Sequence, residues 1–511
     1  GPYSAEQHTT RGGRGKDGVL FFGDLTKKIF AFADISAIMW EDCAGGSPTE
    51  PVPAEERMED RMKIVIVGAG KVGVALTRHL AVENRVTVID QNPHLVENII
   101  NIYDVMGVCG NGASYDVQKE ADVEQADLLI ATTSSDEINI LTCLVAKKMG
   151  VQHTIARIRS PEYGRQLRFM RSELGLSMAI NPEAATAREI ARVLRFPTAM
   201  KLESFSKGRL ELVEYRVAEH TALDGTRLSE LYRNFKVRVL ICAVRRGEQA
   251  FIPDGNFILR GGDKISLTAS PAEVQKLLKR LGVLRKQARD VMILGGSRTA
   301  FYLAKMLSNT GNNVKLIDQN RARCRNLCDA LPNAVIINGD GSQQELLLEE
   351  GLRSMDAFVA LTGIDEENIL MSLFAASQNV PKVISKVNRN ELGDMAEKLG
   401  LDCLVSPKDI TSDVVVRYAR ALRNSQDSNM ETMYKIMDGK AEALEFKVCG
   451  SSAITQTALK DLALKPNTLI AGIIRGRKTI IPTGEDKIMP GDKVVVLAAN
   501  RRLHDLTDII K

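Results

Sequence analysis

From residue 62 onward, short apolar runs alternate with longer stretches of helical periodicity. Runs rich in β-branched residues and nearly free of polar ones are typical of strands buried on both faces of a parallel sheet. Alternating strands and helices imply right-handed crossovers and a doubly wound parallel sheet, an α/β fold of the Rossmann type. The first four predicted strands are Lys63 to Val67, Val86 to Ile89, Val105 to Val108 and Leu128 to Ala131.

The same landmarks occur twice along the chain at one spacing. The segment at 133–141 (TSSDEINIL) resembles 362–370 (TGIDEENIL), Gly110-Asn111-Gly112 resembles Gly339-Asp340-Gly341, and the IPDG and GDK pair at 252–264 resembles the IPTG and GDK pair at 481–493. The two members of each pair lie 229 residues apart. Self-similarity at a fixed period indicates a duplication.

Each copy has two parts that differ in pattern. Residues 62–198 and 289–424 show strand–helix alternation and predict two nucleotide-binding Rossmann-like domains. Residues 199–284 and 425–511 predict two small α+β regulatory domains, each with alternating strands, a turn-rich hairpin region and a terminal helix. A chain of 511 residues suits several such domains and is too long for one core.

The first 61 residues differ from the rest in composition. A Gly/Arg patch precedes a Pro/Glu-rich stretch at 47–60, and Met62 stands directly before the first predicted strand. We interpret residues 1–61 as a cloning-derived or upstream-translated leader, disordered in part. The alternative is a docking arm that uses the five aromatic residues Phe21, Phe22, Phe30, Phe32 and Trp40.

A glycine-rich loop follows the first predicted strand and opens a helix at 72–81. Its residues, all candidates for phosphate binding, are Gly68, Ala69, Gly70, Lys71, Val72 and Gly73. In this motif the first glycine permits a tight turn, the second lets the backbone approach a pyrophosphate, and the third allows close helix packing. Free N–H groups at the helix start then attract phosphate charge.

Asp90 ends the second predicted strand, 17 residues after Gly73. A carboxylate here accepts hydrogen bonds from both ribose hydroxyls and repels a 2′-phosphate, which favours NAD(H), ATP or ADP over NADP(H). Loops that follow the other strands gather at the same edge of the sheet. They add Asn111, Gly112, Thr133, Ser134 and Arg157 as candidates, with Arg157 in position to reach a phosphate.

The second copy of the loop departs from the motif. It keeps Gly295 and Gly296 but has Ser297 and Ala300 where the motif has its second and third glycines. Asp318 is retained, and Arg298 stands at the place of Lys71, where its charge can compensate. The sequence leaves two interpretations open, a weaker or altered nucleotide site and an empty structural fold. The candidates in this copy are Gly295, Gly296, Arg298, Asp318 and Asp340.

Several functional classes lack their signatures. The chain has no HExxH, Walker or nucleophile-elbow motif, no CxxC pair and no apolar stretch of membrane-spanning length. The formal net charge of +4 comes from scattered residues and gives no argument for nucleic acid. The small domains share no catalytic trio, so we predict a binding protein without catalytic or metal-ligating residues. An NAD-dependent oxidoreductase is the alternative.

Residues 62–511 resemble the regulator-of-potassium-conductance family, and most closely the peripheral NAD-binding subunits of bacterial Trk potassium uptake systems. The resemblance is carried by Lys63 to Gly73, Asp90, Gly110 to Ser114, Ala131 to Asn139, Ile155 to Ser160 and the hairpins of both small domains. Within the nucleotide site, Gly68 to Gly73, Asp90, Thr133, Ser134 and Arg157 match nucleotide contacts of the family position by position.

The resemblance implies a regulatory subunit that lies in the cytoplasm against the inner face of the membrane. It further implies a homotetrameric gating ring beneath a Trk-type potassium pore subunit, with ion flux controlled by NAD(H), ATP or ADP. A scaffold for another membrane transporter is an alternative. The preferred nucleotide, the direction of gating and a second effector in the small domains stay open.

Overall fold

The computed structural model describes most of the chain after residue 60. The described residues are 61–160, 163, 166, 173–195, 201–206, 208–247, 249–282, 288–424, 429–437, 440–450, 454–455, 457–499, 503 and 505–511. Contacts divide the chain into Gly1–Asp60 and Arg61–Lys511. The two interpretations of the N-terminal leader therefore concern residues outside the described part, apart from Arg61.

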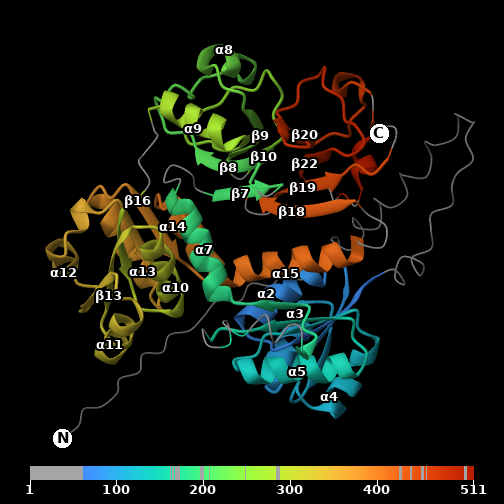
Figure 1. The fold of residues 1–511 in the computed structure, drawn as a ribbon, viewed down its shortest axis with the longest axis vertical. Helices are drawn as coiled ribbons and strands as arrows, with labels where there is room; N and C mark the ends of the chain where they lie inside the picture. Colours follow the sequence, from blue (N-terminus) through green and yellow to red (C-terminus); the bar gives the residue numbers. More distant parts are fainter. Residues whose placement is uncertain are drawn as a thin grey trace, which may run out of the picture. The chain divides into compact units, whose positions relative to one another are not determined.

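The first Rossmann-like domain, blue to teal in Figure 1, contains a six-stranded parallel sheet in the order β3-β2-β1-β4-β5-β6. Its strands are β1 (Lys63–Val67), β2 (Arg85–Asp90), β3 (Met106–Cys109), β4 (Leu128–Ala131), β5 (His153–Arg157) and β6 (Met178–Ile180). Its helices are α2 (Lys71–Leu80), α3 (Pro93–Ile102), α4 (Tyr115–Glu120), η1 (Val123–Gln125), α5 (Asp136–Lys148) and α7 (Pro182–Arg195). All four predicted strands are present, with ends that differ by at most one residue.

The second Rossmann-like domain repeats this topology in the order β14-β13-β12-β15-β16-β17. Its strands are β12 (Asp290–Leu294), β13 (Asn313–Asp318), β14 (Ala334–Asn338), β15 (Ala357–Ala360), β16 (Lys382–Lys386) and β17 (Leu404–Val405). Its helices are α10 (Arg298–Asn309), α11 (Arg321–Ala330), α12 (Gln344–Glu349), η3 (Leu352–Ser354), α13 (Asp365–Ser377), α14 (Asn390–Lys398) and α15 (Pro407–Asn424). The predicted duplication of a doubly wound sheet is confirmed.

Each small domain is built on a five-stranded antiparallel sheet. The first, in the order β10-β9-β11-β8-β7, comprises β7 (Lys201–Phe205), β8 (Leu210–Arg216), β9 (Leu240–Arg246), β10 (Gln249–Phe251) and β11 (Lys264–Ala269), with η2 (Leu228–Glu230), α8 (Leu231–Phe235) and α9 (Pro271–Arg280). The second, in the order β18-β19-β22-β20-β21, comprises β18 (Met430–Ile436), β19 (Ala441–Lys447), β20 (Thr468–Arg475), β21 (Lys478–Ile480) and β22 (Lys493–Ala499), with η4 (Leu459–Asp461) and η5 (Leu506–Ile509).

The predicted terminal helix differs between the two small domains. In the first it is α9, whose N-cap Ser270 accepts a hydrogen bond from the Glu273 N–H. In the second, the described part is the 3₁₀ turn η5, after which Ile510 pairs with Leu464 as an extended bridge. This extended pairing uses backbone N–H and C=O groups that a longer helix would need for its own hydrogen bonds.

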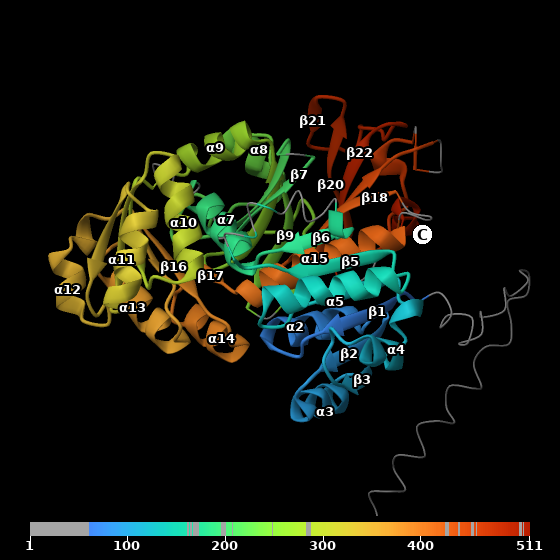
Figure 2. The same ribbon diagram turned by 60° about the horizontal axis from the view of Figure 1, so that its bottom comes forward.

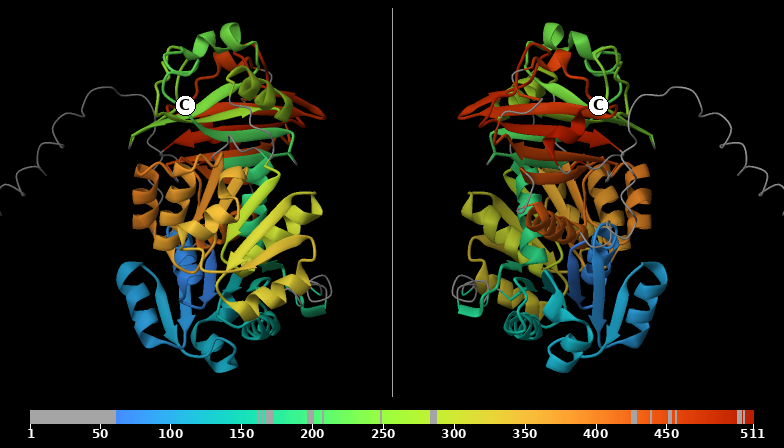
Figure 3. Two further views of the ribbon diagram at one scale, coloured as in Figure 1. Left: turned by 90° about the vertical axis from the view of Figure 1, so that its left-hand side faces the viewer. Right: turned by 90° about the vertical axis from the view of Figure 1, so that its right-hand side faces the viewer.

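The sheets of the two small domains lie together, green and red in Figure 3, and share an apolar core. Buried residues from both sheets form it, among them Phe205, Leu212, Ala443 and Leu497. The rings of Phe205 and Tyr434 meet edge to face, with centroids 5.0 Å apart. A hydrogen bond of 2.7 Å from the Thr268 hydroxyl to the Ala471 carbonyl adds a direct link between the copies.

The last helix of each Rossmann-like domain packs against the other copy (Figure 2). Helix α7 of the first copy lies on α10 of the second, where Ile190 and Leu303 belong to one buried cluster. Helix α15 of the second copy lies on α2 of the first, where Val415 and Leu76 are buried together. Because α2 and α10 begin at the two glycine-rich loops, each loop helix is covered by a helix from the opposite copy.

Candidate functional site

Two glycines of the first loop are required by close backbone contacts. Gly68 has a φ of +106°, and a Cβ there would lie 2.9 Å from the backbone nitrogen of Thr133. A Cβ on Gly73 would lie 1.8 Å from the carbonyl oxygen of Gly68. Gly70 differs, because its Cβ would meet nothing within 4 Å. The loop thus packs tightly at its ends and leaves open space at its middle glycine, which is where the sequence predicts a pyrophosphate.

The start of α2 presents backbone donors without a competing side chain. Gly70 is its N-cap residue and has no side chain to cap the helix, and the first turn contains no acidic residue. The first N–H groups of a helix have no partner within the helix, and the helix dipole adds partial positive charge there. This end of α2 is therefore suited to an anion.

Asp90 lies beside the loop at the end of β2. One carboxylate oxygen accepts a hydrogen bond of 2.6 Å from the Ala69 N–H, and the other accepts one of 2.9 Å from the Asn92 N–H. A carboxylate has about four acceptor positions. One position therefore stays free on each oxygen, which matches the two hydroxyls of a ribose.

Two further candidates, Gly112 and Asn111, contribute to packing and to turn geometry. A Cβ on Gly112 would lie 2.1 Å from Cγ1 of Val67, so this glycine lets its loop pack on β1. The side-chain oxygen of Asn111 accepts a hydrogen bond of 3.1 Å from the Ala113 N–H and closes its own turn. Both residues lie at the edge of the sheet as predicted, with their side-chain positions set by packing and turn geometry.

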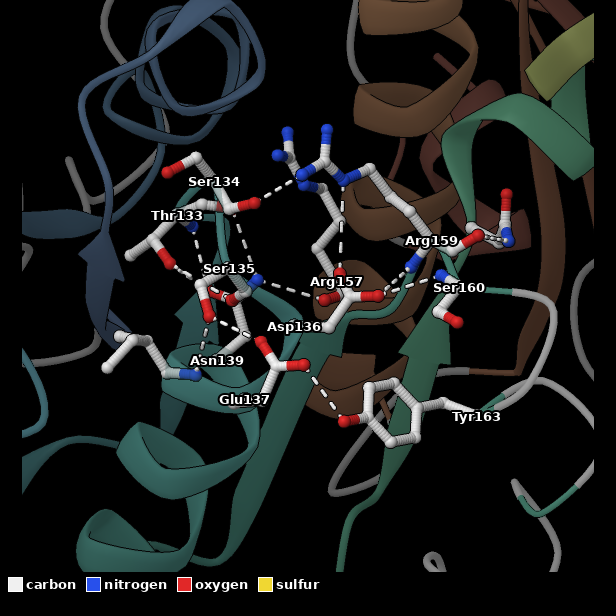
Figure 4. A network of polar contacts seen from close by, with 12 residues as sticks. Thr133, Ser134, Ser135, Asp136, Glu137, Asn139, Arg157, Arg159, Ser160 and Tyr163 are labelled. Carbon is white, nitrogen blue, oxygen red and sulfur yellow. Dashed lines mark hydrogen bonds and ion pairs between the residues drawn. The ribbon is translucent and has the colours of Figure 1, made fainter. Parts of the chain in front are cut away.

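A polar network fixes the loop that contains Thr133 and Ser134 (Figure 4). Asn139, buried at the start of α5, accepts hydrogen bonds from the N–H and the hydroxyl of Thr133, each 2.8 Å. Its amide nitrogen donates to the carbonyl of Arg157 at 2.9 Å. The Ser134 side chain is exposed and points away from this network. Asn139 thus holds the ends of β4 and β5 together.

Asp136 supports the next loop in the same way. Its buried carboxylate accepts hydrogen bonds from the N–H groups of Arg159 and Ser160 at 2.9 and 2.7 Å. The second copy repeats this network with Asp365 and Asn368. In that copy burial favours a higher pKa for Asp365, but hydrogen bonds from Asn388 and Arg389 outweigh burial and hold the pKa below its ordinary value.

Arg157 ends β5 and lies near the second copy. Burial lowers the pKa of its guanidinium, and the charge of Arg159 adds to this effect; the charges of Glu183 and Asp136 oppose it, and that of Arg298 makes a smaller contribution in the lowering direction. No described residue accepts a hydrogen bond from its buried Nε. Lys386 occupies the same place in the second copy, where burial lowers its pKa, the charge of Asp365 opposes this shift and the charge of Lys71 adds to it. Each loop cation, Lys71 or Arg298, therefore interacts with a partly buried cation of the opposite copy.

Contacts between the copies continue beside this cation cluster. The hydroxyl of Tyr302 on α10 donates to the carbonyl of Arg159 at 3.2 Å, and it accepts a hydrogen bond of 3.1 Å from the Asn181 amide. On the other side, Arg78 of α2 pairs with Asp409 of α15 at 3.2 Å. Both loop helices are thereby joined to the opposite copy by polar groups as well as by apolar packing.

The altered loop of the second copy borders a cavity of about 560 Å³. This volume lies within the range of small-molecule sites. The lining residues include Gly295, Gly296, Ser297, Asp318, Asn320, Arg323, Asp340, Gly341, Thr362 and Glu367. Of the second-copy candidates only Arg298 does not line it, and electrostatic compensation by Arg298 stays a prediction. The cation that does line it is Arg323.

Ser297 changes the chemistry of this second loop. Its hydroxyl caps α10 by accepting a hydrogen bond of 3.3 Å from the Ala300 N–H. One of the free donors of the helix start is thereby occupied, in contrast to α2. Altered phosphate binding in this copy stays a prediction, and the cap bears on it by reducing the number of free helix donors.

Models of two domain families match the chain twice each. The TrkA-N domain matches residues 64–182 and 291–407, and the TrkA-C domain matches residues 212–282 and 444–511. Together these matches cover more than half of the chain and repeat in the tandem order N, C, N, C. The chain belongs to the TrkA family.

Curated relatives of this TrkA family member match over nearly their whole length. A Trk system potassium uptake protein TrkA homolog of Archaeoglobus fulgidus is 32% identical over 450 residues, which are 88% of this chain and 100% of the relative. The Trk system potassium uptake protein TrkA of Vibrio alginolyticus is 30% identical over 449 residues, 86% of this chain and 96% of the relative.

Solved structures of similar fold come from GsuK. The GsuK RCK domain aligns with a TM-score of 0.55 at 18% identity and covers 89% of this chain and 96% of that one. The GsuK channel bound to NAD aligns with a TM-score of 0.56 at 17% identity and covers 93% of this chain and 81% of that chain. At this identity the likeness shows the fold alone. It agrees with the predicted tandem α/β architecture.

Three residues of this TrkA family member were missed as parts of the site, namely Asp136, Asn139 and Arg323. The first two belong to the repeated segment at 133–141, and their recurrence at 365 and 368 was the available signal. Arg323 stands five residues after Asp318, where the first copy has Leu95 five residues after Asp90. Comparing the two copies position by position would have found it.

The described residues contain neither a candidate metal site nor a membrane-spanning helix. No group of His, Cys, Asp or Glu suited to a metal ion occurs in the part of the chain that the structure describes. Within that same part, no helix is long and apolar enough to cross a membrane.

Proposed function

We propose that this chain is a nucleotide-binding regulatory subunit of a potassium uptake system, located on the cytoplasmic side of the membrane. The names of its relatives, Trk system potassium uptake proteins, support the transport role. The observation that carries nucleotide binding is the first loop with Asp90, which combines uncapped helix donors and a carboxylate with one free acceptor position per oxygen.

The residues of the first copy fit NAD(H), ATP or ADP. Asp90 binds the ribose hydroxyls, the amides of Gly68 to Gly73 bind the first phosphates, and Arg157 adds positive charge from the end of β5. The ligand acts as a signal, and the protein contributes no chemistry to it. An oxidoreductase would instead change the absorbance of the nicotinamide band when supplied with substrate, and we expect no such change.

Helices α7 and α15, each of which packs on the opposite copy, can transmit a change at the site to the small domains. A phosphate held between Lys71 and Lys386, or between Arg298 and Arg157, reduces repulsion between cations of opposite copies. The start of α2 then approaches the second copy, and α15, which packs on α2, continues to β18 of the second small domain. A ligand shifts such an equilibrium by its differential affinity for the two states, typically about 1–3 kcal/mol.

We expect the chain to form a homotetramer beneath a Trk-type pore subunit and to change shape with ligand. Light scattering and small-angle scattering with and without NADH or ATP measure both properties. A tetramer whose radius of gyration changes on ligand addition is the expected result. A monomer under both conditions would contradict the gating-ring assembly, while nucleotide binding itself would be measured separately by calorimetry.

Lys71→Ala is expected to weaken ATP binding more than NADH binding, by about tenfold or 1.4 kcal/mol. The backbone amides already serve a pyrophosphate, whereas a terminal γ-phosphate carries more charge and extends further towards the lysine. Calorimetry in one buffer at one salt concentration gives the two affinities. Arg298→Ala is the matched variant of the second copy. Equal losses for both ligands would show that Lys71 does not discriminate between them.

A further inference from the structure

The two ribose-binding carboxylates have different numbers of free acceptor positions. In the first copy, Asp90 accepts one backbone hydrogen bond on each oxygen. In the second copy, Asp318 accepts the equivalent bonds from the N–H groups of Gly296 at 2.6 Å and Asn320 at 2.8 Å. It also accepts a hydrogen bond of 2.9 Å from Arg323 on the same oxygen as Gly296. With about four acceptor positions per carboxylate, Asp318 keeps one for a hydroxyl where Asp90 keeps two.

The contact between Arg323 and Asp318 lies against a glycine. A Cβ on Gly296 would lie 3.1 Å from Cδ of Arg323, 3.0 Å from the Asp318 carboxylate and 2.8 Å from Leu327. The first copy has Ala69 at this place and Leu95 in place of the arginine. The arginine and the space for it therefore occur together in the second copy, and neither occurs in the first.

Arg323 offers donors to the cavity beyond its bond to Asp318. Its side chain is 50% exposed and lines the cavity, while the Asp318 side chain is only 5% exposed. A guanidinium has five N–H donors, and the hydrogen bond to Asp318 uses one. The pair is neutral overall, so the carboxylate no longer repels an anion as an unpaired one would. Guanidinium groups bind phosphate in a bidentate manner.

We infer that the second copy is a separate site selective for an adenine nucleotide phosphorylated at the ribose 2′ position, with Arg323 as the specificity-determining residue. This inference rests on the proposed function, that the Rossmann-like domains bind adenine nucleotides. The 3′-hydroxyl donates to the remaining acceptor position of Asp318, and the 2′-phosphate lies on Arg323. An arginine near the end of the second strand is the general device by which this fold accepts a 2′-phosphate. The two copies thus sense different nucleotides.

The test uses two probes that differ only in the 2′-phosphate, adenosine 2′,5′-bisphosphate and AMP. Calorimetry on the full chain carrying Asp90→Ala reports on the second copy. The bisphosphate is expected to bind at least about tenfold more tightly than AMP, a difference of about 1.4 kcal/mol. Adding Arg323→Leu is expected to remove the preference. Arg325→Leu, an exposed arginine of the same helix, is the matched control and should leave it unchanged.

A transfer experiment does not depend on the stability of the Arg323 variant. The transfer uses a chain with Asp318→Ala. Ala69→Gly and Leu95→Arg together give the first copy the glycine and the arginine of the second copy, and they should raise the preference of the first copy for the bisphosphate. Equal affinities of the two probes in the Asp90→Ala chain would overturn the inference. So would a preference that survives Arg323→Leu, or no binding by the second copy. In each case the proposed function would remain testable by itself, because NADH binding that depends on Asp90 is a property of the first copy.

Discussion

Asp90→Ala is expected to weaken binding of NADH and ATP about 30- to 150-fold, a loss of about 2–3 kcal/mol. The substitution removes a charged acceptor whose two free positions match the two ribose hydroxyls. It also removes the partner of the Ala69 and Asn92 N–H groups, which order the loop. Isothermal titration calorimetry on the intact chain measures the loss.

Asp318→Ala is the matched control in the second copy. It removes a carboxylate at the same place in the fold, but one whose charge Arg323 already balances. We expect it to leave NADH binding by the first copy within about twofold. Unchanged affinity for both NADH and ATP after Asp90→Ala would contradict the assignment of the first site.

Gly73→Ala is expected to lower the stability of the first Rossmann-like domain and its nucleotide affinity together. The added Cβ would lie 1.8 Å from the Gly68 carbonyl oxygen, so helix and loop must separate. Overpacking of this kind costs about 1–3 kcal/mol, which lowers the midpoint of thermal unfolding by roughly 2–12 °C for a domain of this size. Differential scanning calorimetry with and without NADH gives both quantities.

The second copy provides the matched control for this substitution as well. It carries Ala300 at the equivalent place, fully buried, so that copy accommodates a Cβ. Ala300→Gly is expected to cost only about 0.5–1 kcal/mol, through helix propensity, and to leave NADH binding by the first copy unchanged. A Gly73→Ala chain with wild-type stability and affinity would show that the close contact of helix and loop does not shape the site.

The strands and the duplication were predictable because their signals are local. Buried parallel strands such as β1 and β4 are almost wholly apolar, and no amphipathic helix has that pattern. The glycine-rich loop was predictable because strand, glycines and helix follow one another directly in the sequence, although the close contact of Gly68 with Thr133 joins distant residues. Asp90 was predictable for the same reason, since the end of β2 is fixed relative to the loop by strand pairing.

Features that depend on contacts between distant residues were not predictable in this way. Gly112 stays a predicted site residue, and the structure adds that its missing side chain makes room for Val67. Helix α7 packs on α10, which begins more than 100 residues later in the chain, and α15 packs on α2, which ends more than 300 residues earlier. The interaction of Arg323 with Asp318 takes place beside Gly296, which has no Cβ and stands 27 residues earlier in the chain. The sequence near Arg323 does not reveal this neighbour.

Potassium flux through a Trk-type membrane subunit, reconstituted in liposomes with this chain, measures nucleotide regulation directly. We expect the flux to change when NADH or ATP is added, and only when the chain is present. With Asp90→Ala we expect this change to require about 30- to 150-fold higher nucleotide concentration. Flux that is the same with and without nucleotide, in the presence of bound chain, would contradict the regulatory role.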